Sequence, residues 1–158
     1  MNNRIRWGRL ALSVAVPLAV GAAAAFLTGR SMQLYDSFEN PPLSPPGWIF
    51  PVVWTLLYIL MGIASYQVSV SDARSVRKQR AMSFYAVQLG LNFFWPLIFF
   101  RLQMFFAAFL WIIALMLLVM ICTLLFAHIR KSAGALLLPY LLWVIFASYL
   151  NLGVYLLN

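Results

Sequence analysis

The chain has 158 residues, of which 65% are hydrophobic and only 9% are charged, and its mean hydropathy is +0.91. Soluble domains carry about 25% charged residues, so this composition excludes a soluble globule and predicts an integral membrane protein with a single domain over residues 1–158. The net charge of +8 does not indicate nucleic-acid binding, because the basic residues form short clusters between long uncharged runs, as in membrane-protein loops.

Five stretches of the chain contain no Lys, Arg, Asp or Glu, and each is long enough to cross a bilayer as a helix, which takes about 20 residues. Backbone groups in lipid must be hydrogen-bonded within the segment, so such stretches become helices. The uncharged stretches are 10–29, 47–71, 81–100, 102–129 and 132–158. We therefore predict an all-α fold, a bundle of five transmembrane helices over 10–29, 47–69, 81–100, 102–128 and 135–157.

The first stretch also resembles the hydrophobic region of a secretory signal peptide. Arg4, Arg6 and Arg9 precede it, and small residues near 23–25 offer a cleavage site. An uncharged run of about 20 residues is long for a signal peptide and suits a membrane span, so we expect the first helix to be retained.

The basic residues divide unequally between the two sides of the predicted bundle. Arg30 and Arg101 fall on one side, and the other nine fall on the opposite side: Arg4, Arg6, Arg9, Arg74, Arg77, Lys78, Arg80, Arg130 and Lys131. Lys and Arg concentrate in cytoplasmic loops, so we predict a multi-pass protein of the cell membrane with its N-terminus inside and its C-terminus outside.

One connection, residues 30–46, is long, polar and proline-rich, and lies outside in this topology. Long loops in compact domains tend to be functional or disordered. The segment 41–46 (PPLSPP) is stiff in polyproline geometry, so we predict an ordered lid. Ser44 and Pro45 are suited to be the N-cap and first residue of the second helix.

The residues needed for ordinary enzyme sites are missing from the sequence. One His, one Cys and three loop carboxylates cannot form a catalytic triad, a carboxylate pair or a multi-ligand metal site. We expect no required cofactor and no metal. His128, near the inner end of the fourth helix, is interpreted as an interfacial residue; a haem axial ligand is the alternative. Cys122 is interpreted as a packing residue.

Aromatic and uncharged polar residues instead recur at helical spacing on three of the predicted helices. Asn and Gln are unfavourable against lipid and should point inward. Such stripes suit a cavity for a flat, conjugated ligand; plain interhelical packing and interfacial belts are the alternative. The stripes are Phe50, Trp54 and Tyr58; Gln88, Asn92, Trp95 and Phe99; and Tyr140, Trp143, Ala147 and Asn151.

Three stretches, in the same order along five spans, resemble the TspO/MBR family of tryptophan-rich sensory or translocator proteins. They are residues 45–62 (PPGWIFPVVWTLLYILMG), residues 88–96 (QLGLNFFWP) and residues 139–151, which begin PYLLW and include Phe146, Ala147, Leu150 and Asn151. The resemblance covers about residues 10–158.

The resemblance implies a five-helix bundle, usually a homodimer, with a pocket under the first extramembrane loop. It also implies that the ligand is a porphyrin, such as protoporphyrin IX or haem, or an isoquinoline-carboxamide-like small molecule. The residues that it places in the pocket are Tyr35, Pro45, Trp54, Asn92, Phe99, Trp143 and Ala147. Trp54 and Trp143 would stack on the ligand or donate indole hydrogen bonds, and the Asn92 amide would orient its carbonyl or carboxylate.

Two departures from the family pattern stand out. Leu43 occupies the place of a common loop tryptophan, so one aromatic wall of the lid is missing. The cholesterol motif proposed for animal relatives needs a basic residue after a tyrosine, and only Leu156, Leu157 and Asn158 follow Tyr155. We therefore expect no cholesterol recognition there.

Three functions are compatible with these features. The first is a membrane receptor, sensor or carrier for tetrapyrroles, involved in porphyrin transport or stress signalling. The second is light- and oxygen-dependent porphyrin degradation that uses pocket tryptophans. The third is a structural membrane protein without a ligand.

Overall fold

The computed structural model describes residues 5–32, 35 and 37–158, and within them it contains helices and no strand, which confirms the predicted fold class. Five of its helices are long and apolar enough to cross a membrane. They are α1 (Trp7–Met32), α2 (Ile49–Ser69), α3 (Ser75–Pro96), α4 (Phe105–Ile129) and α5 (Lys131–Leu157).

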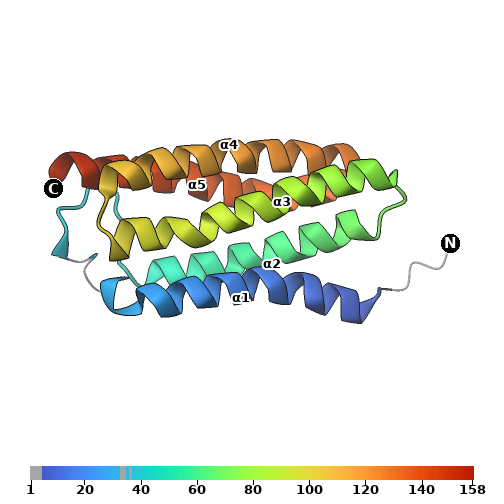
Figure 1. Cartoon of the computed structure of the whole chain (residues 1–158), viewed down its shortest axis with the longest axis horizontal. Helices are drawn as coiled ribbons and strands as arrows, with labels where there is room; N and C mark the ends of the chain where they lie inside the picture. The colour runs from blue at the N-terminus through green and yellow to red at the C-terminus, as the bar shows by residue number, and fades with distance from the viewer. Residues whose placement is uncertain (1–4, 33–34, 36) are drawn as a thin grey trace.

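The five helices run side by side along the long axis of the molecule, and the chain ends lie at opposite ends of the bundle (Figure 1). The most extensive contacts join α4 to α5, α1 to α2, α3 to α4 and α2 to α5, and smaller contacts join α1 to α3. The helices therefore close into a ring in the order α1–α2–α5–α4–α3. Although α2 and α3 are consecutive in the chain, they touch only slightly, because α5 packs against α2 on that side.

Several helices extend beyond the predicted bounds. The α1 helix begins at Trp7, α3 begins at Ser75 and α5 begins at Lys131, so each takes in basic residues that lie outside the uncharged stretch. A helix can continue after its side chains leave the hydrocarbon. The positions of charged residues therefore predict the membrane-spanning segment more accurately than they predict the ends of the helix.

The third span does not end as a regular helix. Pro96 lacks the amide hydrogen that an α-helix needs, and its ring disfavours the regular geometry. A π-helical turn follows over Leu97–Arg101, with the Leu102 amide donating to the Leu97 carbonyl at 3.0 Å. Gln103, with a φ of 53°, then turns the chain into α4.

A glycine allows α1 and α2 to pack closely away from the long loop. A Cβ placed on Gly62 would lie 2.5 Å from the Val14 Cα and 2.7 Å from the Ser13 carbonyl oxygen. Both of those atoms belong to the backbone of α1, so a larger side chain at this position would have to push the helices apart.

The described basic side chains gather at one end of the bundle. The start of α1, the segment 74–80 and the α4–α5 junction lie at one end of the bundle, whereas the π-helical turn before α4 lies at the other end (Figure 1). The first three segments contain Arg6, Arg9, Arg130 and Lys131 and the basic residues of 74–80, and the turn contains Arg101. Arg4, Asp36 and the side chain of Arg30 lie outside the described residues.

The loop before α2 is attached at several points to the end of the bundle that carries the C-terminus. The side-chain amide of Asn158 accepts from the Glu39 amide at 3.1 Å and donates to the Glu39 carbonyl at 3.0 Å. The Tyr149 hydroxyl donates to the Pro42 carbonyl at 2.9 Å. The ring of Phe38 contacts those of Phe99 and Phe105, at centroid distances of 6.3 and 5.2 Å.

The prediction that Ser44 and Pro45 start the second helix is wrong. The α2 helix begins at Ile49, after Trp48. The Ser44 hydroxyl donates backwards to the Pro41 carbonyl at 2.7 Å, which closes a turn inside the loop instead of capping a helix. Leu43, with a φ of 69°, points outward and is 84% exposed.

Candidate functional site

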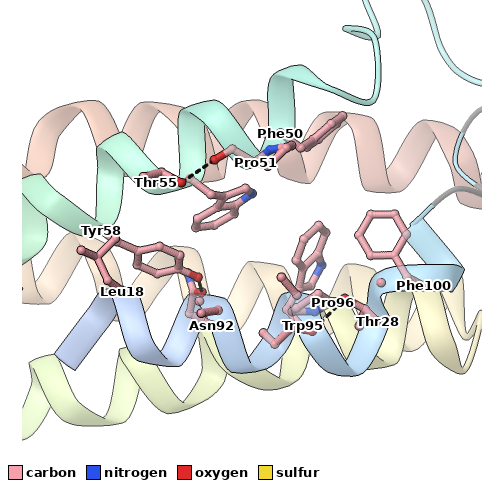
Figure 2. Close-up of a pocket in the computed structure, with 16 residues that line it drawn as sticks. Leu18, Thr28, Phe50, Pro51, Thr55, Tyr58, Asn92, Trp95, Pro96 and Phe100 are labelled. Carbon is pink, nitrogen blue, oxygen red and sulfur yellow. Dashed lines mark hydrogen bonds between the residues drawn. The ribbon is translucent and has the colours of Figure 1, made fainter. Parts of the chain in front are cut away.

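A cavity of about 540 Å³ lies between α1, α2 and α3, in the half of the bundle nearer the long loop. Figure 2 shows Tyr58 from α2 and Asn92 and Trp95 from α3 lying around the space between the helices. Ligand pockets in proteins commonly measure about 300–1,000 Å³, so this cavity has the size of a small-molecule site.

The α1 wall of the cavity consists mainly of small residues. Gly21, Ala25 and Gly29 follow one another at spacings of four residues, and Ala22 lies three residues before Ala25, so they share one broad helix face. Leu18, Ala24 and Thr28 complete this wall. This wall was not predicted from the sequence, because the predicted pocket rested on aromatic and polar stripes. The signal available in the sequence was this periodic row of Gly and Ala.

The opposite walls are aromatic. Phe50, Trp54 and Tyr58 come from α2, and Trp95 and Phe100 come from the end of the third span. The Trp54 ring lies 5.6 Å from that of Tyr58, with 31° between the planes, and 6.4 Å from that of Trp95, with 34° between the planes. These tilted rings present faces and edges to an apolar guest.

A chain of buried hydrogen bonds fixes the polar part of the cavity wall. The Tyr58 hydroxyl donates to the Asn92 side-chain oxygen at 2.6 Å, and the Asn92 nitrogen donates to the Tyr140 hydroxyl at 2.8 Å. Tyr140 in turn donates to Gln88 at 2.8 Å. Networks of this kind hold side chains rigidly in a medium of low dielectric constant, so the Asn92 amide has one defined orientation.

The contact between Tyr58 and α1 limits the end of the cavity that is farther from the long loop. A Cβ on Gly21 would lie 2.2 Å from the Cε2 atom of Tyr58, so only glycine lets the tyrosine ring occupy this place. The ring then reaches across to Asn92.

Five of the seven predicted site residues fall into two groups in the structure. Trp54 and Asn92 line the cavity. Tyr35, Phe99 and Ala147 instead surround a separate void of about 10 Å³ beside α5. The side chains that line both spaces are Phe50, Trp95 and Phe100.

The other two predicted residues lie outside both spaces. The Trp143 ring packs against Phe50 at 5.9 Å and against Phe146 at 5.6 Å. Its indole nitrogen is buried without a hydrogen-bond partner. Pro45 is half-buried in the loop before α2. The predicted stripe on α3 that contains Asn92 is linked to α5 through Trp95. The Trp95 indole N–H donates to the Asn151 side-chain oxygen at 2.9 Å.

His128 and Cys122 lie on α4, which contributes no residue to the cavity. The His128 ring is exposed, and its Nδ1 lies 2.8 Å from the Leu124 carbonyl oxygen. Cys122 is buried. Among the described residues there is no group of three or more His, Cys, Asp or Glu side chains that could hold a metal ion.

The sequence resembles known proteins over almost its whole length. Residues 13–156 match the model of the TspO/MBR family. The chain is 42% identical over 151 residues to the tryptophan-rich protein TspO of Archaeoglobus fulgidus, which covers 95% of this chain and 97% of that protein. It is 38% identical to the tryptophan-rich protein TspO of Chlorobaculum tepidum, over 100% of this chain and 99% of that protein. The human translocator protein is 29% identical over 147 residues, covering 92% of this chain and 87% of the human protein.

Proposed function

This chain belongs to the TspO/MBR family and is an integral membrane protein, and from this premise we propose that it is a receptor, sensor or carrier for tetrapyrroles. The proposed ligand is a porphyrin such as protoporphyrin IX or haem, and isoquinoline-carboxamide-like molecules would bind at the same place. We assign the ligand to the cavity between α1, α2 and α3.

The observation that carries this proposal is the contrast between the cavity walls. The Gly and Ala side chains of α1 leave room for a flat molecule, and the rings of Trp54 and Trp95 on the opposite side can stack on it. Asn92 supplies a fixed amide at the edge of the cavity, as required for orienting a carbonyl or carboxylate group. An apolar pocket with a few convergent polar groups is typical of small-molecule sites.

Tyr35, Phe99, Trp143 and Ala147 form the second part of the proposed site. They lie behind Phe50 and Trp95, whose side chains separate the small void from the cavity. A ligand larger than the cavity would have to turn these rings aside. Its polar edge would then meet the unpaired indole N–H of Trp143. Pro45 lies in the loop, four residues before α2 begins at Ile49.

Three further features complete the proposal. The basic end of the bundle faces the cytoplasm, so the N-terminus is inside and the C-terminus outside the cell membrane. The chain forms a homodimer. Ligand binding requires no cofactor or metal.

Porphyrin degradation in light and oxygen is the second candidate, because two indoles lie 6.4 Å apart at the cavity wall and would contact the bound ligand. In that reaction the tryptophans would act as redox groups. Receptor and enzyme would use the same cavity, so they differ in what happens to the ligand after it has bound.

The test is titration of the purified protein with protoporphyrin IX in the dark, comparing Trp54→Ala with Trp7→Ala. Trp54 lines the cavity, whereas Trp7 is 71% exposed at the opposite end of the bundle and serves as the matched control. Loss of one stacking indole should cost about 1–3 kcal/mol, or about 5- to 150-fold in affinity. Trp7→Ala and His128→Ala should bind like the wild type.

Wild-type affinity in Trp54→Ala, or an equal loss in Trp7→Ala, would place the ligand elsewhere. Illumination of the complex then separates the two candidates. Stable porphyrin absorbance supports the receptor, whereas loss of absorbance that depends on Trp54 supports the degrading enzyme.

A further inference from the structure

One side of the cavity is open to the surface of the bundle. Five residues both line the cavity and are exposed, and together they form what we call the α1–α2 window. They are Ala22, Ala25 and Gly29 of α1 and Pro51 and Thr55 of α2. The lining side chains of Asn92, Trp95 and Phe100, on the α3 side, are buried instead.

The window lies at a depth that faces lipid tails. Ala25 is seven residues before the end of α1, and Thr55 is six residues after the start of α2. At about 1.5 Å per residue, both are about 10 Å below the helix ends. In a hydrocarbon core about 30 Å thick, the surroundings at this depth are acyl chains.

The window is also chemically suited to lipid. The Thr55 hydroxyl donates to the Pro51 carbonyl at 2.7 Å, and the neighbouring Thr28 hydroxyl donates to the Ala24 carbonyl at 2.8 Å. Both threonines are therefore satisfied within their own helices. The remaining window residues are Ala, Gly and Pro, so this opening carries no charged group.

The other ends of the cavity are covered by packed side chains. At the outer end, the Tyr35 ring lies 5.0 Å from Phe50 and 6.5 Å from Phe100. At the inner end, Tyr58 packs directly on Gly21. Within the part of the chain that the structure describes, the route of least obstruction is therefore sideways.

The helix that forms one edge of the window is the least buried of the five. Only 11% of the α1 span is buried, compared with 33–44% in the other four spans. The window is therefore bordered by the least buried helix of the bundle, which keeps its extensive contact with α2.

We propose that ligands enter and leave the cavity from within the bilayer, through the α1–α2 window, and that the side-chain volume at Ala25 and Thr55 controls the passage. This inference rests on the proposed function and narrows the ligand class: the protein takes flat molecules that partition into the membrane. A polar molecule that stays in water does not reach this opening.

The experiment measures association and dissociation rates of protoporphyrin IX by stopped flow, with the protein in lipid nanodiscs. Ala25→Phe narrows the window, and Ala23→Phe is the matched control, because Ala23 is exposed on the same helix but does not line the cavity. Thr55→Phe tests the opposite edge, with its exposed neighbour Leu56→Phe as control. The second pair keeps the test valid if the first does not fold, and every variant should elute at the wild-type size.

A barrier on the route slows both directions, so Ala25→Phe and Thr55→Phe should reduce association and dissociation alike, by about fivefold or more. If the new ring merely filled the site, dissociation would become faster, and that result would overturn the proposal. Wild-type rates with intact saturable binding would also overturn it while leaving the proposed function in place. No saturable binding by the wild type would refute both.

Discussion

The close contact between Gly21 and Tyr58 makes Gly21→Ala a sharp perturbation of the site. The added methyl would lie 2.2 Å from the Cε2, 2.7 Å from the Cδ2 and 2.9 Å from the Cζ of Tyr58. The tyrosine ring therefore has to move. It is held by Trp54 on one side and by its 2.6 Å hydrogen bond to Asn92 at the tip, so the movement breaks packing or the bond.

The expected size of the effect follows from these contacts. Overpacking of a tight site costs about 1–3 kcal/mol, and leaving the buried Asn92 oxygen unpaired costs about 1–3 kcal/mol more. Part of this penalty lowers the free energy of unfolding. The other part weakens ligand binding, because the displaced ring occupies space in the cavity. We expect Gly21→Ala to weaken protoporphyrin IX binding by about fivefold or more, equivalent to about 1 kcal/mol, and to lower the thermal unfolding midpoint in detergent.

The matched control is Gly29→Ala. Gly29 lines the same cavity on the same helix, but an added Cβ there meets nothing within 4 Å. This variant should bind like the wild type. In a Tyr58→Leu background, which removes the clashing ring atoms, Gly21→Ala should have little further effect, and a double-mutant cycle would show this coupling. Equal losses in the two glycine variants, or additive effects in the cycle, would refute the reasoning.

Three further predictions concern stability, topology and assembly. Gly62→Ala, which would press on the backbone at Val14, should cost about 1–3 kcal/mol and lower the midpoint by about 2–10 °C, whereas Gly90→Ala, with open space around it, should not; thermal unfolding of both variants decides. A reporter that is active only in the cytoplasm, fused after Asn158, should give no signal, and a strong signal would reverse the proposed orientation. Gly90→Leu should produce monomers in detergent if the exposed face of α3 with Ala86 and Gly90 is shared between protomers; intact dimers would place the interface elsewhere.

The five helices were predictable because a helix needs about 20 uncharged residues to cross the bilayer. Their ends were less so: the segment 75–80 is basic and still helical, because the backbone continues beyond the hydrocarbon. The α-helical end at Pro96 and the π-helical turn after it depend on local hydrogen bonding, which a charge pattern does not encode.

The cavity was only partly predictable. Trp54 and Asn92 belong to helical stripes visible in the sequence, and the resemblance to the TspO/MBR family implied that both line the pocket. Trp143 and Ala147 also face inward, but spacing along one helix cannot tell which neighbour a side chain meets. That depends on the ring order, in which α5 lies beside α2 and away from α1. The α1 wall was not predicted, because Gly and Ala leave room in the cavity and carry no aromatic or polar group that marks them in the sequence.

The lining of the cavity comes from one part of the chain, and the support of two lining side chains comes from another. Every residue that lines it comes from the segment 18–100, so the α4–α5 hairpin contributes no lining side chain. The hairpin nevertheless holds two lining residues, through the bonds from Asn92 to Tyr140 and from Trp95 to Asn151. Substitutions at these two α5 positions could therefore change how Asn92 and Trp95 are held, while the side chains that line the cavity keep their sequence.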